Sequence, residues 1–308
     1  MLNKILKKKF LTSITVIFIL VIIYIVSNNS VDFKQELAYV NDDTPLNNIY
    51  LLDGYQFISL TNVALKEASV ESKAREIIDI LIQDGPGENK VPSGFKSIIN
   101  PDTTLNSLKF VDGILKLDFS DSLFDTKEEY EVKVLESLIY SLTSIKDVKG
   151  IEISINGKLL EELPKSKLKL PKVLDKTFGI NKDIAVSSLE DVSKVTIYYI
   201  NKYNDSYYYV PVTRYINNKS EKVNVIIDEL KNNNFYMTGL MSFMNNEVDL
   251  IDSSIENDEM TLSFNEYLYD DYDSKEVLKE VIESINLSIE ATYGIDAVSY
   301  IVENEPLK

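Results

Sequence analysis

The sequence contains no cysteine and no histidine in its 308 residues. These absences remove the commonest general base, the commonest zinc ligands and any thiol nucleophile. A chain without cysteine also gains no stability from disulfide bonds, even where it works outside the cytoplasm. Catalysis by carboxylate, Lys, Ser or Tyr side chains is still open, but the common routes are excluded. The sequence therefore favours a binding or assembly role, and we expect no enzyme activity, no catalytic residue, no cofactor and no metal site.

Acidic residues outnumber basic ones in this chain, and arginine is scarce. The formal net charge is −17 at pH 7, and the arginines are only Arg75 and Arg214. An acidic protein repels the phosphates of nucleic acids and anionic lipid head groups. So few arginines also offer few bidentate contacts to phosphate. Nucleic acid is therefore not expected as a partner.

A long apolar segment lies near the N-terminus. Residues 10–26 are uncharged and almost entirely apolar, and lysines precede them without any acidic residue. A helix needs about 20 mostly apolar residues to span a bilayer, and positive charges mark its cytoplasmic side. We therefore predict a cytoplasmic basic segment (residues 1–9), a transmembrane signal anchor (residues 10–27) and a polar tether (residues 28–47), with the following domains outside the cell membrane.

A cleaved signal peptide is the alternative explanation of this segment. Signal peptides have shorter apolar cores and a cleavage site made of small residues. The first alanine of this chain is Ala38, well beyond the apolar segment. These features favour an anchor that stays attached and makes the chain a single-pass membrane protein.

The remaining sequence contains a long internal repeat. Residues 112–124 and 258–269 share one alternation of apolar and polar residues. The apolar positions that align are Leu115, Leu117 and Phe119 in the first segment and Met260, Leu262 and Phe264 in the second. The match extends upstream to residues 76–81 and 225–230, and downstream to residues 148–155 and 295–302. A repeat of this length predicts two copies of one domain.

Each copy is predicted to follow the order β-β-α-β-α-β. In the first copy the expected strands are residues 48–52, 56–64, 114–119 and 151–155, and the helices are 69–82 and 126–145. In the second copy the strands are residues 195–200, 206–216, 260–264 and 298–302, and the helices are 220–232 and 273–292. Capping boxes at Thr126 with Glu129 and at Asp273 with Glu276 are expected to open the second helix of each copy.

This order predicts an α+β fold made of two tandem domains. The first covers residues 48–157 and the second residues 195–305, with a linker at residues 158–194. In each domain the helices should pack on one face of a mixed sheet.

Tyrosines crowd the first predicted hairpin of the second copy. They are Tyr198, Tyr199, Tyr203, Tyr207, Tyr208, Tyr209 and Tyr215. Neighbouring side chains on a strand point to opposite faces, so consecutive tyrosines cannot all be buried on one face. Exposed tyrosines are common in protein interfaces. We therefore take Tyr207, Tyr208 and Tyr209 as candidate interface residues, with an ordinary edge hairpin as the alternative.

Two further motifs are better explained by structure than by ligand binding. The acidic run Asp270, Asp271 and Asp273 lacks the spacing of an EF-hand loop and precedes a predicted helix, whose dipole stabilises acids. The turn sequence at residues 85–87, Gly-Pro-Gly, follows a predicted helix and lacks the rest of a phosphate-binding loop. It is therefore interpreted as a helix cap and turn.

The order of motifs in the first copy resembles the GerMN domain family. The motifs are Gly-Pro at residues 85–86, Val-Pro-Ser-Gly at 91–94, the strand segment at 112–124, a helix, and Val-Lys-Gly-Ile-Glu-Ile-Ser-Ile-Asn-Gly at 148–157. The resemblance covers about residues 45–305 and implies tandem GerMN domains in an envelope scaffold, attached to the outer side of the membrane. It implies no catalytic residues, and it implies a role in sporulation, germination or another envelope complex.

We therefore expect an extracytoplasmic scaffold that acts by protein–protein association. Its partners would be other envelope or sporulation proteins, or copies of itself, and the membrane would be contacted through residues 10–27. The alternative is a protein that binds a small ligand or a cation in a cleft between the two domains. A third possibility, a carboxylate-dependent hydrolase, would need two carboxylates that converge in a cleft, and the sequence shows no such pair.

Overall fold

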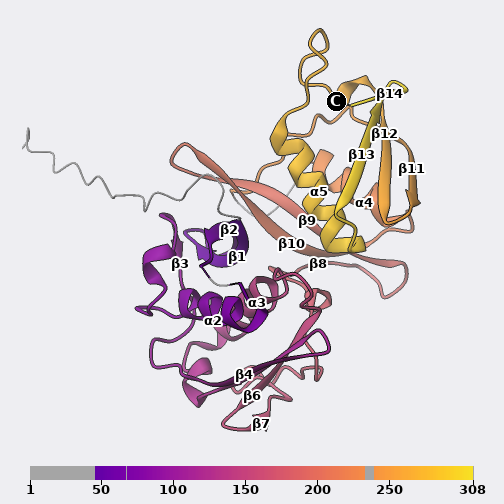
Figure 1. The fold of residues 1–308 in the computed structure, drawn as a ribbon. Helices are drawn as coiled ribbons and strands as arrows, with labels where there is room; N and C mark the ends of the chain where they lie inside the picture. Colours follow the sequence, from indigo (N-terminus) through magenta and orange to yellow (C-terminus); the bar gives the residue numbers. More distant parts are fainter. Residues whose placement is uncertain (1–45, 67, 233–238, 308) are drawn as a thin grey trace, which may run out of the picture. The chain divides into compact units, whose positions relative to one another are not determined.

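The computed structural model describes residues 46–66, 68–232 and 239–307 (Figure 1). In these ranges no helix is both long and apolar enough to cross a membrane. The anchor predicted at residues 10–27 lies outside the described residues, as does the predicted tether except for its last residues, Leu46 and Asn47.

The first copy contains two helices and a sheet of four strands beside its N-terminal hairpin. Its elements are β1 (Leu46–Asp53), β2 (Ile58–Ala64), α2 (Val70–Leu81), the 3-10 helix η1 (Glu88–Lys90), β3 (Phe95–Lys96), β4 (Leu105–Val111), β5 (Ile114–Phe119), the 3-10 helix η2 (Asp121–Phe124), α3 (Glu128–Leu142), β6 (Gly150–Ile155) and β7 (Lys158–Leu159). The hairpin of β1 and β2 is antiparallel, β3 pairs with β1, and the four-stranded sheet has the order β4-β5-β6-β7.

The second copy repeats this arrangement. Its elements are β9 (Val192–Tyr203), β10 (Ser206–Asn217), α4 (Lys222–Lys231), β11 (Leu250–Glu256), β12 (Glu259–Phe264), the 3-10 helix η4 (Glu266–Leu268), α5 (Lys279–Tyr293), β13 (Ala297–Val302) and β14 (Glu305–Pro306). Between the copies lie the 3-10 helix η3 (Lys176–Phe178) and β8 (Asp183–Ala185). The second four-stranded sheet has the order β11-β12-β13-β14, and β12 and β13 are parallel, as are β5 and β6.

The two hairpins share one sheet. Its order is β3-β1-β2-β10-β8, and β9 pairs with β10 (Figure 1). The α+β class is confirmed, but the prediction of one mixed sheet per copy is wrong. The reason lies in α3, on which Leu135, Leu138, Tyr140 and Leu142 are all buried. A helix that is apolar on more than one face needs cover on more than one side, and α3 contacts both β1 and β6.

Serines on the second helix of each copy bind the hairpin backbone at equivalent positions. In the first copy the amide of Tyr50 donates to Ser141 Oγ over 2.9 Å. In the second copy the amide of Tyr198 donates to Ser288 Oγ, also over 2.9 Å. The repeat alignment therefore continues into the hairpins, with Tyr50 equivalent to Tyr198.

The aligned core positions are buried in both copies. Phe119 and Phe264 are 0% and 1% exposed, which confirms the expected burial of both rings. The other aligned pairs, Ile77 with Ile226 and Leu142 with Ile289, are also buried.

The two copies meet through the equivalent tyrosines. The hydroxyl groups of Tyr50 and Tyr198 are hydrogen bonded over 2.8 Å, and both side chains are buried. Tyr140 packs edge-on against Tyr50, with ring centroids 5.3 Å apart. Nearby, β2 and β10 form a ladder pair between Leu60 and Tyr209. Side chains therefore fill this part of the junction, where the alternative of a cleft-bound ligand would need open space.

The segment predicted as a linker takes part in this junction. Asn181 donates from Nδ2 to the carbonyl oxygens of Ile58 and Pro211, each over 2.8 Å, and its Oδ1 accepts from the amide of Ile58. Its side chain thus bridges β2 and β10 beside their single ladder pair. The segment is also held by α3, because the buried carboxylate of Glu131 accepts from the backbone amides of Lys165 and Ser166.

We expect the hydroxyl groups of Tyr50 and Tyr198 to contribute to the free energy of unfolding in a non-additive way. Tyr50→Phe and Tyr198→Phe should each lower the free energy of unfolding by about 1–2 kcal/mol, because the remaining hydroxyl would be buried without a partner. The double variant should lose less than the sum, since neither hydroxyl is then left alone. Urea unfolding of the three variants measures the coupling, and strictly additive losses would contradict it.

Candidate interaction site

The three candidate tyrosines of β10 lie in different surroundings. Tyr207 is 45% exposed and packs edge-on against Phe243, with centroids 5.1 Å apart. Tyr208 is half-buried and donates from its hydroxyl to Asp53 Oδ2 over 3.0 Å. Tyr209 is half-buried against the core that includes the first copy. Of the three, Tyr207 presents the exposed ring, while Tyr208 and Tyr209 help to join the copies.

The half-buried tyrosines keep their protons at physiological pH. Burial raises the pKa of Tyr209 to about 12. Burial, followed by the Asp53 carboxylate, raises the pKa of Tyr208 far above its usual range. Tyr208 is therefore a permanent hydrogen-bond donor toward the first copy.

The acceptor of that bond, Asp53, is a buried carboxylate at the end of β1. Its Oδ1 accepts from the amides of Tyr55 and Phe57, each over 2.8 Å. Its Oδ2 accepts from Ser59 Oγ over 2.9 Å and from Tyr208. One carboxylate therefore closes the β1–β2 turn and attaches the hairpin of the second copy to it.

The acidic run of the second copy forms a local turn. Asp271 Oδ1 accepts from the amide of Asp273 over 2.9 Å, and such hydrogen bonds hold the pKa of Asp271 below its usual range. The helix α5 begins only at Lys279, so the explanation by a helix N-terminus is wrong. Across the described ranges, no group of three or more His, Cys, Asp and Glu residues is placed to hold a metal ion.

The strands β4 and β11 lie at equivalent edges of the two four-stranded sheets (Figure 1). Side chains cover the two edges differently. On β4 the amide of Phe110 donates to Glu71 Oε1 of α2 over 3.3 Å. The repeat aligns Phe110 with Ile255 of β11 and Glu71 with Ser220, whose side chain is shorter. Ile255 is 52% exposed, and its amide meets no side-chain acceptor within the described part of the chain. Among the residues that the structure describes, the edge of the second copy therefore has no side-chain acceptor at the position where Glu71 covers the first.

An open groove adjoins this edge. Its volume is about 500 Å³. Its lining residues are Glu221, Lys222, Val223, Ser253, Ser254, Ile255, Met260 and Tyr293. In the first copy Val70 and Phe110 pack against the core near the corresponding position. The groove thus combines apolar side chains with an unshielded strand edge.

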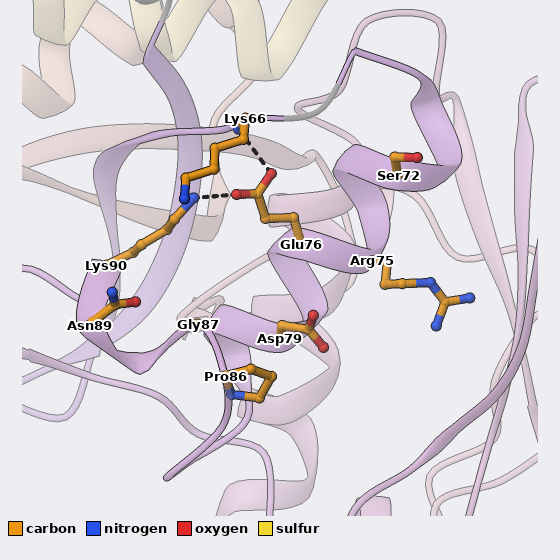
Figure 2. Close-up of a pocket in the computed structure, with 9 residues that line it drawn as sticks. All are labelled: Lys66, Ser72, Arg75, Glu76, Asp79, Pro86, Gly87, Asn89 and Lys90. Carbon is orange, nitrogen blue, oxygen red and sulfur yellow. Dashed lines mark hydrogen bonds and ion pairs between the residues drawn. The ribbon is translucent and has the colours of Figure 1, made fainter. Parts of the chain in front are cut away.

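A charged pocket lies on the first copy between α2 and η1. Its volume is about 400 Å³. Figure 2 shows its lining residues, which are Lys66, Ser72, Arg75, Glu76, Asp79, Pro86, Gly87, Asn89 and Lys90. One ion pair lies inside it, between Lys90 and Glu76, and Glu76 also accepts from the amide of Lys66 over 3.0 Å. Lys90 donates further to the carbonyl oxygen of Ala64.

The turn that forms one wall of this pocket is packed directly on α2. The amide of Gly87 donates to the carbonyl oxygen of Asp79 over 3.3 Å. A Cβ atom at Gly87 would lie only 2.6 Å from the amide nitrogen of Ile80. Only glycine therefore permits this approach, and residues 85–87 form a turn as predicted, although the residue that caps α2 is Ile82.

Comparison with known proteins supports the family resemblance. The family profile described as "Germane: Sporulation and spore germination" matches residues 48–161 and 196–308. The spore germination protein GerM of Bacillus subtilis (strain 168) is 30% identical over 261 residues, which cover 83% of this chain and 71% of that protein.

A solved structure of tandem domains agrees with this match. The tandem GerMN domains of the sporulation protein GerM from Bacillus subtilis superpose with a TM-score of 0.77 at 29% identity, over 85% of this chain and 92% of that chain. The first GerMN domain of the same protein matches 44% of this chain at 27% identity, with a TM-score of 0.40. The internal repeat agrees with the family profile, with the 30% identical relative and with the tandem-domain structure, and the chain belongs to the GerMN family, with two GerMN domains in tandem.

Proposed function

We propose that the chain is a membrane-anchored, extracytoplasmic scaffold of a sporulation or germination complex and that it acts by binding another protein. The relative named as a spore germination protein supports the process. The apolar segment at residues 10–26, preceded by lysines, supports the anchor and its orientation. The proposed role requires no catalytic residue, cofactor or nucleic acid.

The observation that carries the proposal is the open edge of β11. An edge strand exposes unpaired backbone groups, and proteins usually cover or blunt such edges. The first copy covers the equivalent edge with Glu71, whereas the second copy leaves Ile255 half exposed beside a groove lined by both apolar and polar side chains. Extended segments of partner proteins bind to edges of this kind by adding a strand.

The first copy indicates what the occupant should look like. There, an aromatic side chain, Phe110, packs at the edge, and its amide is satisfied by a carboxylate. The proposed occupant is therefore an extended segment of a partner protein that pairs with β11 and places a large apolar side chain in the groove. Acidic residues of β11, Asp252 and Glu256, would favour basic residues beside that side chain.

Tyr207 is a second contact candidate on the same copy. Its ring is exposed, and Lys202 Nζ lies 5.6 Å from its centroid. The proposed interface of the β9–β10 hairpin therefore rests on Tyr207, because Tyr208 and Tyr209 are engaged at the junction between the copies.

Ile255→Lys is expected to lower recovery of the partner about tenfold or more, which corresponds to about 1.4 kcal/mol of binding free energy. The new side chain would place a solvated charge in the groove and oppose pairing at the edge. The partner is identified first by crosslinking the intact wild-type protein in cells and isolating it from membranes. Its recovery with the variant is then compared by quantitative mass spectrometry.

Val111→Lys is the matched control for this test. Val111 lies at the end of β4 in the first copy and is 43% exposed, so the substitution is similar in chemistry and exposure. It should leave recovery unchanged. Equal recovery with both variants would exclude β11 as the docking edge.

The binding of a small ligand between the copies has less support. It would need an open cleft at the junction, which Tyr50, Tyr198 and Asn181 fill with mutual hydrogen bonds and strand contacts.

A further inference from the structure

A basic segment between the two copies has the chemistry that the β11 edge requires. Residues 165–172 read Lys-Ser-Lys-Leu-Lys-Leu-Pro-Lys, with four lysines and no acid, and they lie between β7 and η3. The occupant expected at β11 is an extended segment that carries a large apolar side chain beside basic residues. In this segment Leu168 stands between Lys167 and Lys169. The chain therefore contains a sequence of the kind that its own strand edge should bind.

The three central side chains of this segment are exposed. Leu168 is 41% exposed, and Lys167 and Lys169 are also exposed. The next apolar residue, Leu170, instead packs against the core of the first copy. Both lysines lie within 4 Å of the Glu162 carboxylate, at 3.9 and 2.5 Å. Because exposed ion pairs contribute little free energy, these lysines can exchange Glu162 for other carboxylates at little cost.

The backbone of the segment also presents an edge. Lys169 lies opposite Glu162 in an antiparallel bridge. The residues on either side of Lys169 bond across this bridge, since the carbonyl of Leu168 accepts from the amide of Leu163 over 3.0 Å and the amide of Leu170 donates over 2.9 Å. The backbone groups of Lys169 therefore point away from the bridge. They meet no backbone partner in the part of the chain that the structure describes.

The charge around β11 is opposite to that of the segment. Residues 195–305 contain 21 acidic and 7 basic side chains, so the second copy should attract a basic segment. Asp252 and Glu256 of β11 are exposed, and neither is ion-paired within the described ranges. Two β11 strands placed side by side would bring these carboxylates together, and like charges on paired strands are destabilising.

We propose that the partner at β11 is a second molecule of this chain, whose residues 165–172 pair with β11. The inference rests on the proposed β11 contact and names its partner. Alternate side chains of a strand point to opposite faces. Leu168 can therefore enter the groove on the face of Ile255, while Lys167 and Lys169 meet Asp252 and Glu256 on the other face.

The contact joins two molecules because each surface is held in its own copy. The buried carboxylate of Glu131 on α3 accepts from the amides of Lys165 and Ser166 over 2.7 and 2.8 Å, and Leu163 is buried. In the described residues β11 forms a ladder with β12 alone. A contact between two different surfaces leaves one segment and one edge available at its ends, so it extends into a chain of molecules or closes into a ring.

Photocrosslinking of the full chain in cells identifies the occupant. A photoreactive residue replaces Ile255, and a second molecule carries a different affinity tag. We expect crosslinks from position 255 to residues 165–172 of the second molecule. A crosslink to a different protein would overturn this inference while leaving the proposed β11 contact intact. Absence of any protein crosslink at position 255 would contradict both.

Substitutions in the segment test its chemistry. Lys167→Gln combined with Lys169→Gln should weaken self-association of the full chain in detergent about tenfold or more, and so should Leu168→Gln. The matched control is Lys109→Gln combined with Lys116→Gln, which removes two exposed lysines that lie opposite each other on β4 and β5. The control should have no effect. Sedimentation equilibrium measures the association, and circular dichroism verifies that the variants are folded.

Mixing two variants tests whether the two surfaces meet. Ile255→Lys keeps the segment but blocks the edge, whereas the double lysine variant keeps the edge but weakens the segment. Each alone should be monomeric at a concentration where the wild type associates. Their equimolar mixture should form dimers, because one productive contact is left. A mixture of folded variants that stays monomeric, or a wild type that does not associate, would overturn the proposal.

Discussion

Asp53→Ala is expected to lower the free energy of unfolding by about 3–5 kcal/mol. The carboxylate accepts four hydrogen bonds, two from backbone amides of the β1–β2 turn and two from side-chain hydroxyls. Alanine would leave the hydroxyl groups of Ser59 and Tyr208 without this acceptor. Each orphaned buried donor carries its own desolvation cost, so the loss exceeds that of a single hydrogen bond.

Two further variants separate the charge from the shape of this side chain. Asp53→Asn keeps one acceptor oxygen for the amides of Tyr55 and Phe57, so it should lose less than the alanine variant. Asp205→Ala removes a fully exposed carboxylate from the turn of the β9–β10 hairpin and should change stability by less than about 0.5 kcal/mol. Urea unfolding followed by circular dichroism gives all three values. A loss near zero for Asp53→Ala would show that water replaces the carboxylate at little cost.

The helices and central strands could be predicted because their periodicity is strong. The apolar stripe of residues 69–82 corresponds to α2, and Ser69 accepts a hydrogen bond at its N-cap. The alternation at residues 114–119 corresponds to β5, with Leu115, Leu117 and Phe119 buried. In both elements the positions that are apolar in the sequence are the positions that are buried in the structure, so the sequence pattern alone predicts the element and its buried face.

The edge strands β4 and β11 could not be predicted in this way. All of their residues are exposed or only half-buried, so neither strand has a continuous buried apolar face. Their positions are set by pairing with β5 and β12 rather than by burial. The proposed docking edge was therefore missed because a strand with little buried surface has little apolar pattern.

The predicted capping boxes are wrong for a related reason. The helix α3 begins at Glu128 without a side-chain cap, and α5 begins at Lys279. Before α3, the 3-10 helix η2 buries Phe124. Before α5, Asp271 and Glu276 form an isolated β-bridge, and the amide of Asp270 donates to the carbonyl oxygen of Glu276. Contacts outside the helices thus involve the residues before each of them, so the match to a capping motif does not decide where the helix starts.

The contacts of the candidate site depend on distant residues. Tyr208 and Asp53 are 155 positions apart, and no local pattern links them. The composition gave one indication of the charged pocket. Arginine is rare in the chain, and Arg75 lines this pocket. That signal identifies a residue but not the pocket, which depends on the close approach of Gly87 to α2.

Phe119→Ala should lower the free energy of unfolding by about 3–5 kcal/mol, because its ring is fully buried and the substitution leaves a cavity. The same loss is expected for Phe264→Ala in the second copy. Tyr272→Ala, which truncates an exposed aromatic ring, is the control and should have little effect.

The shared hairpin sheet predicts that the two copies unfold together in both variants. The copies are joined by the pairing of Leu60 with Tyr209 and by the buried hydroxyl pair of Tyr50 and Tyr198. A cavity in one copy should therefore shift a single unfolding transition that includes both copies, as expected for one cooperative unit. Urea unfolding followed by circular dichroism and by tyrosine fluorescence tests this, since both probes should report the same midpoint. Two separate transitions in Phe119→Ala, with the second copy unfolding as in the wild type, would show that the junction does not couple the domains.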